Sequence, residues 1–274
     1  MDTNIAAQPD YAAIKTKQNA AWASGDYARI GVTLQFTGEQ LAEAMDLPPG
    51  ASVLDVAAGN GNATLAFARR GCDVTSTDYV EALLSRGRAR AEAESLEIKS
   101  QVADAEQLPF GDGLFDAVVS TFGVMFTPDQ AAAAREIVRV CRPGGKIGMT
   151  NWTPGGFIGQ LFKTLGRHVP PLSGVSSPAL WGSRPWLKET FANTAHSIAI
   201  VERTFLFRYA SANHFLDVFR TYYGPVHKAF LSLDPPGQER LEADLLDLVA
   251  RFNQDADGTM RVPSEYAEII LTRA

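Results

Sequence analysis

The chain has 274 residues, of which 46% are hydrophobic and 20% are charged, a balance typical of a globular protein with a full core. Its formal net charge of −6 argues against a broad basic surface for nucleic acid, and no apolar run approaches the roughly 20 residues that span a bilayer. Two cysteines and four scattered histidines disfavour a disulfide scaffold and a metal site.

These exclusions, together with the lack of a basic and apolar secretory signal in the opening residues MDTNIAAQPDYAAIK, favour a cytoplasmic protein. We expect its partner to be a small molecule, without nucleic acid, membrane or metal. The composition does not predict an oligomeric state.

The first fifty residues have the pattern of helices. Residues 35–45 carry apolar side chains at roughly helical spacing, and a Leu-Pro-Pro-Gly run at 47–50 ends this pattern. The hydrophobic period then changes. Residues 53–58 form a short continuous apolar run, which is typical of a strand buried on both faces of a parallel sheet.

The same cycle of strand and helix repeats as far as residue 151. We expect helices over 63–70, 80–95 and 129–141, and strands over 73–77, 98–103, 115–120 and 146–151. Strands and helices that alternate at this spacing predict a parallel sheet with helices on both of its faces.

The pattern loosens after residue 152. A stretch rich in Gly, Pro and Ser extends to residue 182 and contains one short expected helix at 160–166. Beyond it we expect a helix over 185–192, a strand over 197–207, amphipathic helices over 211–223 and 238–252, and a closing strand over 266–272. The chain then divides into N-terminal helices (1–50), a ligand-binding core (51–152) and the rest of the sheet with cap insertions (153–274).

The turn after the first expected strand, Asp55-Val-Ala-Ala-Gly59-Asn-Gly61, points to a ligand. Glycines at these positions let the backbone turn sharply and approach a ligand closely, below the N-terminus of a helix. A dinucleotide-binding turn has a third glycine where this chain has Thr64. The acidic residue ahead of the glycines also suits a cationic amino acid moiety better than a pyrophosphate. A tight turn without a ligand is the alternative.

Two further aspartates end the next two expected strands. Asp78 is placed to accept both hydroxyls of a ribose. Asp104 and the backbone of Ala105 offer an acceptor for an adenine amino group and a donor for a ring nitrogen. Each aspartate taken alone is explained equally well as the cap of the helix that follows.

Taken in order, these motifs resemble those of class I S-adenosylmethionine-dependent methyltransferases, nearest to the branch around ubiquinone and menaquinone biosynthesis. The resemblance spans about residues 30–152 and is carried by Asp55-x-Ala-x-Gly59-x-Gly61, Thr77-Asp78, Asp104-Ala105-Glu-Gln-Leu-Pro-Phe, Phe115-Asp116-Ala-Val-Val and Arg142-Pro-Gly-Gly-Lys. Ala57 stands where the family often has glycine, and its methyl side chain is tolerable there.

The resemblance implies an α/β, Rossmann-like fold: a doubly wound, mostly parallel seven-stranded sheet, with the last strand antiparallel, under a helical cap. It also implies S-adenosylmethionine as cofactor, bound by Tyr27, Asp55, Ala57, Gly59, Gly61, Asp78, Tyr79, Asp104, Ala105, Thr121 and Phe122. Within this set, Asp55 and the glycine turn hold the methionine part. Tyr27, together with Trp22, folds over the cofactor from the N-terminal helices, although plain helix packing explains these two residues as well.

Methyl transfer asks little of the protein's side chains, because the sulfonium is already a strong electrophile. An acceptor that must lose a proton still needs a base. His227, beyond the Gly224-Pro225 break in the expected cap, is our first candidate, and a packed histidine is the alternative. We expect the acceptor pocket to be bordered by Phe126, Trp152 and Tyr223.

The function predicted from the sequence is methyl transfer from S-adenosylmethionine to a small molecule that the sequence does not identify. Two alternatives stay open. One is a nicotinamide-dependent oxidoreductase, against which Thr64 argues, and the other is a module that binds S-adenosylmethionine without catalysis.

Overall fold

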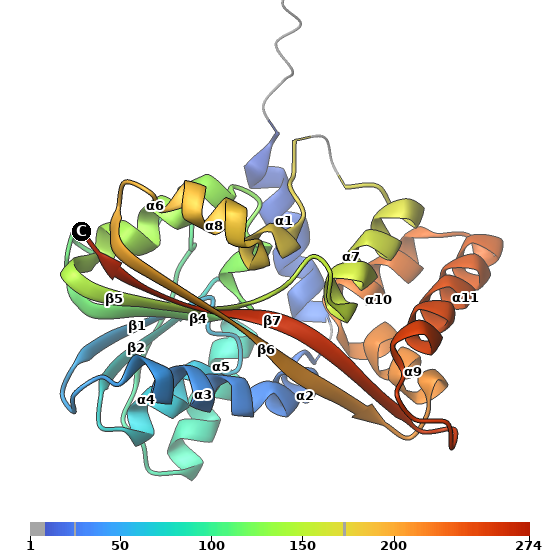
Figure 1. Cartoon of the computed structure of the whole chain (residues 1–274), viewed down its shortest axis with the longest axis horizontal. Coiled ribbons are helices and arrows are strands. Elements are labelled where there is room, and N and C mark those ends of the chain that lie inside the picture. The colour runs from blue at the N-terminus through green and yellow to red at the C-terminus, as the bar shows by residue number, and fades with distance from the viewer. Residues whose placement is uncertain (1–8, 25, 172–173) are drawn as a thin grey trace, which may run out of the picture.

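The computed structural model describes residues 9–24, 26–171 and 174–274. Its centre is a seven-stranded sheet with the strand order β3-β2-β1-β4-β5-β7-β6 (Figure 1). The parallel strands are β1 (Ser52–Val56), β2 (Asp73–Asp78), β3 (Lys99–Val102), β4 (Phe115–Thr121) and β5 (Cys141–Trp152). The last strand, β7 (Met260–Arg273), runs antiparallel to β5 and to β6 (Ala195–Tyr209). The predicted α/β architecture is confirmed.

The central strands are apolar because helices cover both faces of the sheet. Val53, Leu54 and Val56 of β1 are completely buried. In Figure 1, one face is covered by α3 (Gln35–Met45), α4 (Asn62–Arg69) and α5 (Glu81–Ala93), and the other by α6 (Gln130–Val140) and α8 (Arg184–Thr190). The Asp129 carboxylate caps α6 by accepting a hydrogen bond of 2.9 Å from the Ala132 amide.

Four helices gather beside the long β6–β7 pair (Figure 1): α7 (Phe157–His168), α9 (Ala212–Tyr222), α10 (Gly224–Ser232) and α11 (Pro235–Phe252). Their shared core is aromatic. The Phe215 ring centroid lies 4.1 Å from that of Phe219 and 5.5 Å from that of Phe157. Helices α9 and α11 correspond to the two amphipathic patterns from which a cap was predicted.

Helix α10 corrects one expectation. The Gly224-Pro225 pair, interpreted as a break, instead begins this helix. Proline is well tolerated in the first turn of a helix, because its missing N–H would have no partner there.

Strand β7 is longer than expected, since it begins at Met260 and not at residue 266. Its pairing with β5 ends where Trp152 meets Tyr266, and the earlier residues of β7 pair with β6 alone, as far as Met260 with Tyr209. This extension lies beyond the doubly covered sheet, so it lacks the continuous apolar pattern by which a buried strand is recognised.

The N-terminal residues form α1 (Tyr11–Ser24), α2 (Ala28–Gly31) and the 3₁₀ turn η1 (Val32–Leu34), and two more 3₁₀ turns follow as η2 (Val124–Phe126) and η3 (Pro178–Gly182). Helix α1 packs closely on α10, because a Cβ atom at Gly224 would lie 3.3 Å from the Ala21 carbonyl oxygen. Over the described ranges, no helix is long and apolar enough to cross a membrane. The same ranges contain no cluster of His, Cys, Asp or Glu suited to a metal ion.

Candidate functional site

A cavity lies at the carboxyl ends of β1 to β4, where the order of the strands reverses between β1 and β4. Ligands of doubly wound sheets bind at this kind of position. The hollow measures about 860 Å³ when the open space at its mouth is included. Of the residues expected to bind the cofactor, those that line it are Tyr27, Ala57, Gly59, Asp78, Tyr79, Asp104, Ala105, Thr121 and Phe122.

The loops after β1 and β4 meet at the floor of the cavity in strained conformations. Ala57 and Phe122 have φ angles of 52° and 53°, in the left-handed region that side chains other than glycine disfavour. A Cβ atom at Gly123 would lie 2.2 Å from the Ala57 carbonyl oxygen, so only glycine allows the two loops to touch. Strain of this kind persists where the surrounding structure enforces it, and it clusters at ligand sites.

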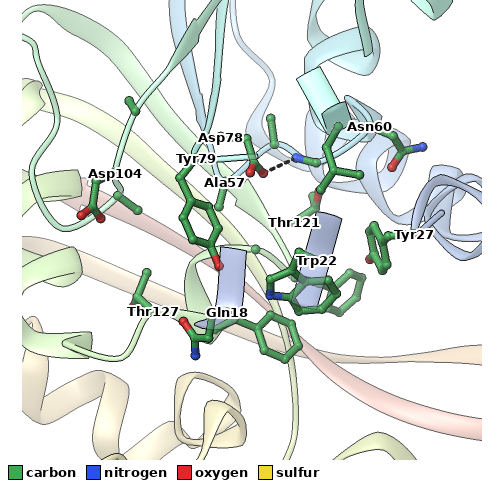
Figure 2. A pocket seen from close by; sticks show the side chains of 18 of the residues that line it. Gln18, Trp22, Tyr27, Ala57, Asn60, Asp78, Tyr79, Asp104, Thr121 and Thr127 are labelled. Carbon is green, nitrogen blue, oxygen red and sulfur yellow. Dashed lines mark hydrogen bonds between the residues drawn. The ribbon is translucent and has the colours of Figure 1, made fainter. Parts of the chain in front are cut away.

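Asp78 is the buried carboxylate of this floor (Figure 2). Its Oδ2 accepts a hydrogen bond of 2.9 Å from the Gly59 amide, and its Oδ1 accepts one of 2.8 Å from the Val80 amide. Burial raises the pKa of Asp78 to about 6, although these backbone bonds lower it. The group is therefore mostly ionised at neutral pH. Because a carboxylate offers about four acceptor positions, it can also accept two ligand hydroxyls.

Asp55 and Gly61, also expected to bind the cofactor, lie behind the turn and do not line the cavity. The Asp55 Oδ2 accepts hydrogen bonds from the Thr64 amide at 2.8 Å and from the Thr64 hydroxyl at 2.6 Å, which ties the turn to α4. Burial raises the pKa of Asp55 to about 7. Gly61 has a φ of 85°, in the left-handed region that favours glycine, and it lies beside Gly87 of α5.

Asp104 lies at the opposite end of the cavity from Tyr27, with Tyr79 between them in Figure 2. Its Oδ1 accepts a hydrogen bond of 2.9 Å from the Glu106 amide. Its Oδ2 lies 2.5 Å from the Lys15 ammonium nitrogen.

Helix α1 closes this side of the cavity with Lys15, Gln18 and Trp22. Sequence reasoning missed the first two. Their spacing of three and four residues, which places side chains on one helix face, is a signal that could have found them.

The other end of the cavity is aromatic. The Trp22 ring centroid lies 5.1 Å from that of Phe126 and 5.3 Å from that of Tyr27, and all three residues line the cavity. Phe126 is thus placed as a pocket wall, as expected. Burial raises the pKa of Tyr27 well above its usual range, so its phenol is neutral at physiological pH.

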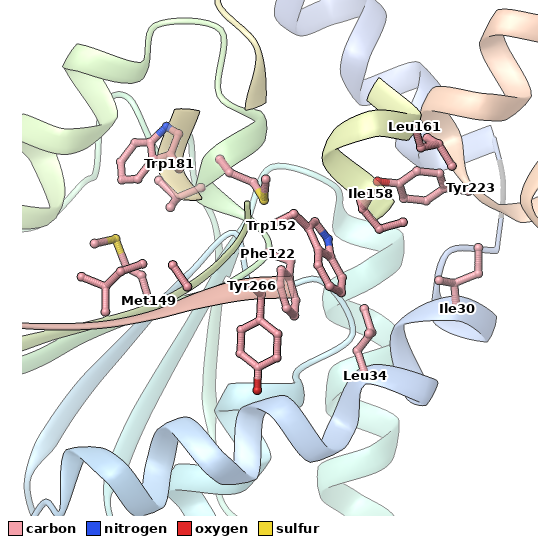
Figure 3. Close-up of a cluster of buried hydrophobic side chains, with 14 of the residues drawn as sticks. Ile30, Leu34, Phe122, Met149, Trp152, Ile158, Leu161, Trp181, Tyr223 and Tyr266 are labelled. Carbon is pink, nitrogen blue, oxygen red and sulfur yellow. The ribbon is translucent and has the colours of Figure 1, made fainter. Parts of the chain in front are cut away.

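Trp152 and Tyr223, the other two expected acceptor contacts, form a second layer behind this wall. Trp152 stacks on Phe122 with ring centroids 4.1 Å apart (Figure 3). Tyr223 packs behind Trp22 at 5.8 Å. Both residues support side chains that line the cavity and do not line it themselves.

His227, the expected base, does not line the cavity. It lies on α10, where its Nδ1 is 2.9 Å from the Arg220 carbonyl oxygen. No histidine is among the described residues that line the cavity.

The comparisons with known proteins agree with this geometry. A methyltransferase domain model matches residues 54–149, from β1 into β5. A Mycobacterium tuberculosis protein described as uncharacterized is 40% identical over 263 residues, 92% of each chain. Demethylmenaquinone methyltransferase of Thermus thermophilus is 32% identical over 165 residues, 59% of this chain and 74% of that protein. A solved putative methyltransferase from Bacillus halodurans shares the fold, with a TM-score of 0.60 at 20% identity over 86% of this chain and 97% of that one.

The fold, the strand-end cavity and these relatives define a class I S-adenosylmethionine-dependent methyltransferase. Within that class, the chain belongs to the quinone methyltransferase-like branch, and S-adenosylmethionine is its cofactor.

Proposed function

We propose that this enzyme transfers the methyl group of S-adenosylmethionine to a small molecule that binds against the aromatic wall of Trp22, Tyr27 and Phe126. One observation carries the proposal: a single cavity extends from the carboxylates of Asp78 and Asp104 to these rings. Such a cavity offers polar groups to a nucleoside at one end and an apolar surface to an acceptor at the other.

The cofactor's polar parts match the strand ends. Asp78 has acceptor positions left that would hold the ribose hydroxyls, and Asp104 with Ala105 would hold the adenine edge. The backbone from Ala57 to Gly59 and the side chain of Thr121 take the methionine part. Asp55 and Gly61 contribute from behind, by fixing the turn against α4 and α5.

The bound cofactor supplies a methyl group on a sulfonium, which reacts with a nucleophile without further activation. The enzyme's own residues therefore align the acceptor and exclude water. The rings of Trp22 and Phe126 do the latter, because they pack edge to face at the wall. The phenols of Tyr27 and Tyr223, whose pKa values burial raises far above their usual range, stay protonated and cannot serve as bases at neutral pH.

The cavity also limits the acceptor's chemistry. The carboxylates that line the described cavity, those of Asp78, Asp104 and Glu106, already accept hydrogen bonds from backbone amides, and no histidine lines it. We infer that the acceptor atom is one that is ionised near neutral pH or that needs no proton removed before it attacks.

A panel assay tests this function. The enzyme would be incubated with S-adenosylmethionine and, separately, with small apolar phenols, amines and carbon acids, with a mixed peptide pool, and with oligonucleotides. We expect S-adenosylhomocysteine to form only with members of the small-molecule set. Methyl transfer confined to peptide or nucleic acid would contradict the proposal.

A further inference from the structure

One cation joins α1 to the loop after β3. The Lys15 ammonium nitrogen lies 2.5 Å from the Asp104 Oδ2 and 2.9 Å from the Glu106 Oε2. Among the described residues, it is the only cationic group within salt-bridge distance of either carboxylate. The side chains of Glu106, Lys15 and Asp104 are 6%, 27% and 35% exposed, so the two ion pairs are partly buried and still reached by solvent ions.

Both carboxylates are fixed on the side away from Lys15. The Glu106 Oε1 accepts a hydrogen bond of 2.8 Å from the Asp129 amide, at the start of α6. The Asp104 Oδ1 accepts one of 2.9 Å from the Glu106 amide. Two neighbouring negative charges are thus held against α1, and a partly buried charge is costly without a partner. The single positive charge of Lys15 offsets them.

The same helix forms a wall of the cavity. Lys15 and Trp22 line it from α1, and Asn19 donates a hydrogen bond of 2.7 Å to the Tyr79 carbonyl oxygen. A ligand enclosed between α1 and the strand ends leaves more readily when α1 moves away. The contacts of Lys15 oppose that movement at the end where Asp104 lies.

We propose that Lys15 is a positioning residue for the cofactor. It clamps α1 onto Asp104 and Glu106, fixes the Asp104 carboxylate at the adenine end and slows the release of the cofactor. Asp104 keeps capacity for an adenine amino group, because Lys15 and the Glu106 amide use only two of its roughly four acceptor positions. The inference rests on the cofactor arrangement proposed above and is independent of the acceptor.

The test is the rate at which the full-length enzyme releases S-adenosylhomocysteine, followed by stopped-flow displacement with excess S-adenosylmethionine. Lys15→Gln should release it about tenfold faster, which corresponds to about 1.4 kcal/mol. Lys15→Arg keeps the charge and should stay within about threefold of the parent enzyme. The matched control is Lys17→Gln, an exposed lysine on the opposite side of α1, which should leave the rate unchanged.

The dependence of the release rate on ionic strength distinguishes a role of the Lys15 charge from a purely structural role of the side chain. Because ions screen charge pairs, the parent's release rate should increase with ionic strength, while that of Lys15→Gln should not. Release from Lys15→Gln at the parent rate, or with the parent's salt dependence, would overturn the proposal. If Lys15→Gln did not fold, Lys15→Arg and the salt response of the parent would decide. Failure of the parent to bind S-adenosylhomocysteine at all would instead reject the underlying cofactor arrangement.

Discussion

The two ends of the cavity are built in different ways. The nucleoside end consists of short segments that directly follow β1, β2 and β3. Hydrogen bonds from backbone amides to carboxylates, such as that from Gly59 to Asp78, connect these segments. The aromatic end brings together Trp22 of α1 and Phe126 of η2, and Tyr223, at the junction of α9 with α10, packs in the layer behind them. The first depends on local chain geometry and the second on side-chain packing between distant segments. Substitutions at the first end should therefore change cofactor affinity, and those at the second should change acceptor turnover.

The largest expected effect is at the nucleoside end. Asp78→Ala should weaken the binding of S-adenosylhomocysteine by roughly 1–3 kcal/mol, the range for hydrogen bonds made by a charged acceptor. Isothermal titration calorimetry measures this change. Asp73→Ala, at the exposed start of the same strand, is the matched control and should bind like the parent. Equal affinity of the two variants would contradict the role of Asp78.

Cofactor affinity should also depend on pH. The pKa of Asp78 is raised to about 6, so its ionised form, the form proposed to accept the ribose hydroxyls, predominates above that pH and is lost as the pH falls through it. At pH 5 the affinity for S-adenosylhomocysteine should be about tenfold lower than its plateau value, as linkage to one proton requires. Calorimetry between pH 5 and pH 8 measures this. Asp78→Asn, which has no proton to exchange, should show a much flatter profile.

A substitution at the aromatic end should lower acceptor turnover and leave cofactor affinity nearly unchanged. Phe126→Ala removes a ring that packs on Trp22, and aromatic pairs of this kind contribute about 0.5–1.5 kcal/mol beyond their buried area. We expect kcat/KM for the acceptor to fall about tenfold, while the affinity for S-adenosylhomocysteine changes less than twofold. Leu114→Ala, at an exposed leucine, should change neither. A loss of cofactor affinity that matched the loss of turnover would remove the distinction between the two ends.

The smallest effect is expected for His227→Ala. The histidine bonds a backbone carbonyl on α9 and does not line the cavity, so turnover should stay within about twofold of the parent. This variant also tests the sequence-based hypothesis that His227 is a base. A large fall in turnover with unchanged cofactor affinity would support that hypothesis against the observed placement.

The nucleoside end was accessible to sequence reasoning because its geometry is local. The carboxyl ends of parallel strands meet at one edge of a sheet, so Gly59, Asp78 and Asp104 had to lie near one another once the strands were recognised. The sequence did not predict as well the direction in which each of these side chains points. Asp55 faces Thr64 behind the turn, since the alternation of side chains along β1 places it there.

The aromatic end was only partly predictable, because it depends on packing between segments. Which ring forms the first layer and which the second is decided by contacts across the cap, and so Trp152 and Tyr223 lie one layer further out than expected. The direction in which His227 points is set by its position on α10. This helix was not predicted, because the Gly224-Pro225 pair was interpreted as a break. The spacing of Lys15, Gln18 and Trp22 places them on one face of α1, but it does not predict that α1 folds across the cavity.

A crystal structure with S-adenosylhomocysteine tests the central claim most directly. We predict that the adenine lies beside Asp104 and Ala105, that the ribose hydroxyls bond Asp78, and that the sulfur faces the wall of Trp22 and Phe126. A ligand bound in the reverse direction, with its adenine against the aromatic wall, or bound outside this cavity, would contradict the proposed division between a nucleoside end and an acceptor end.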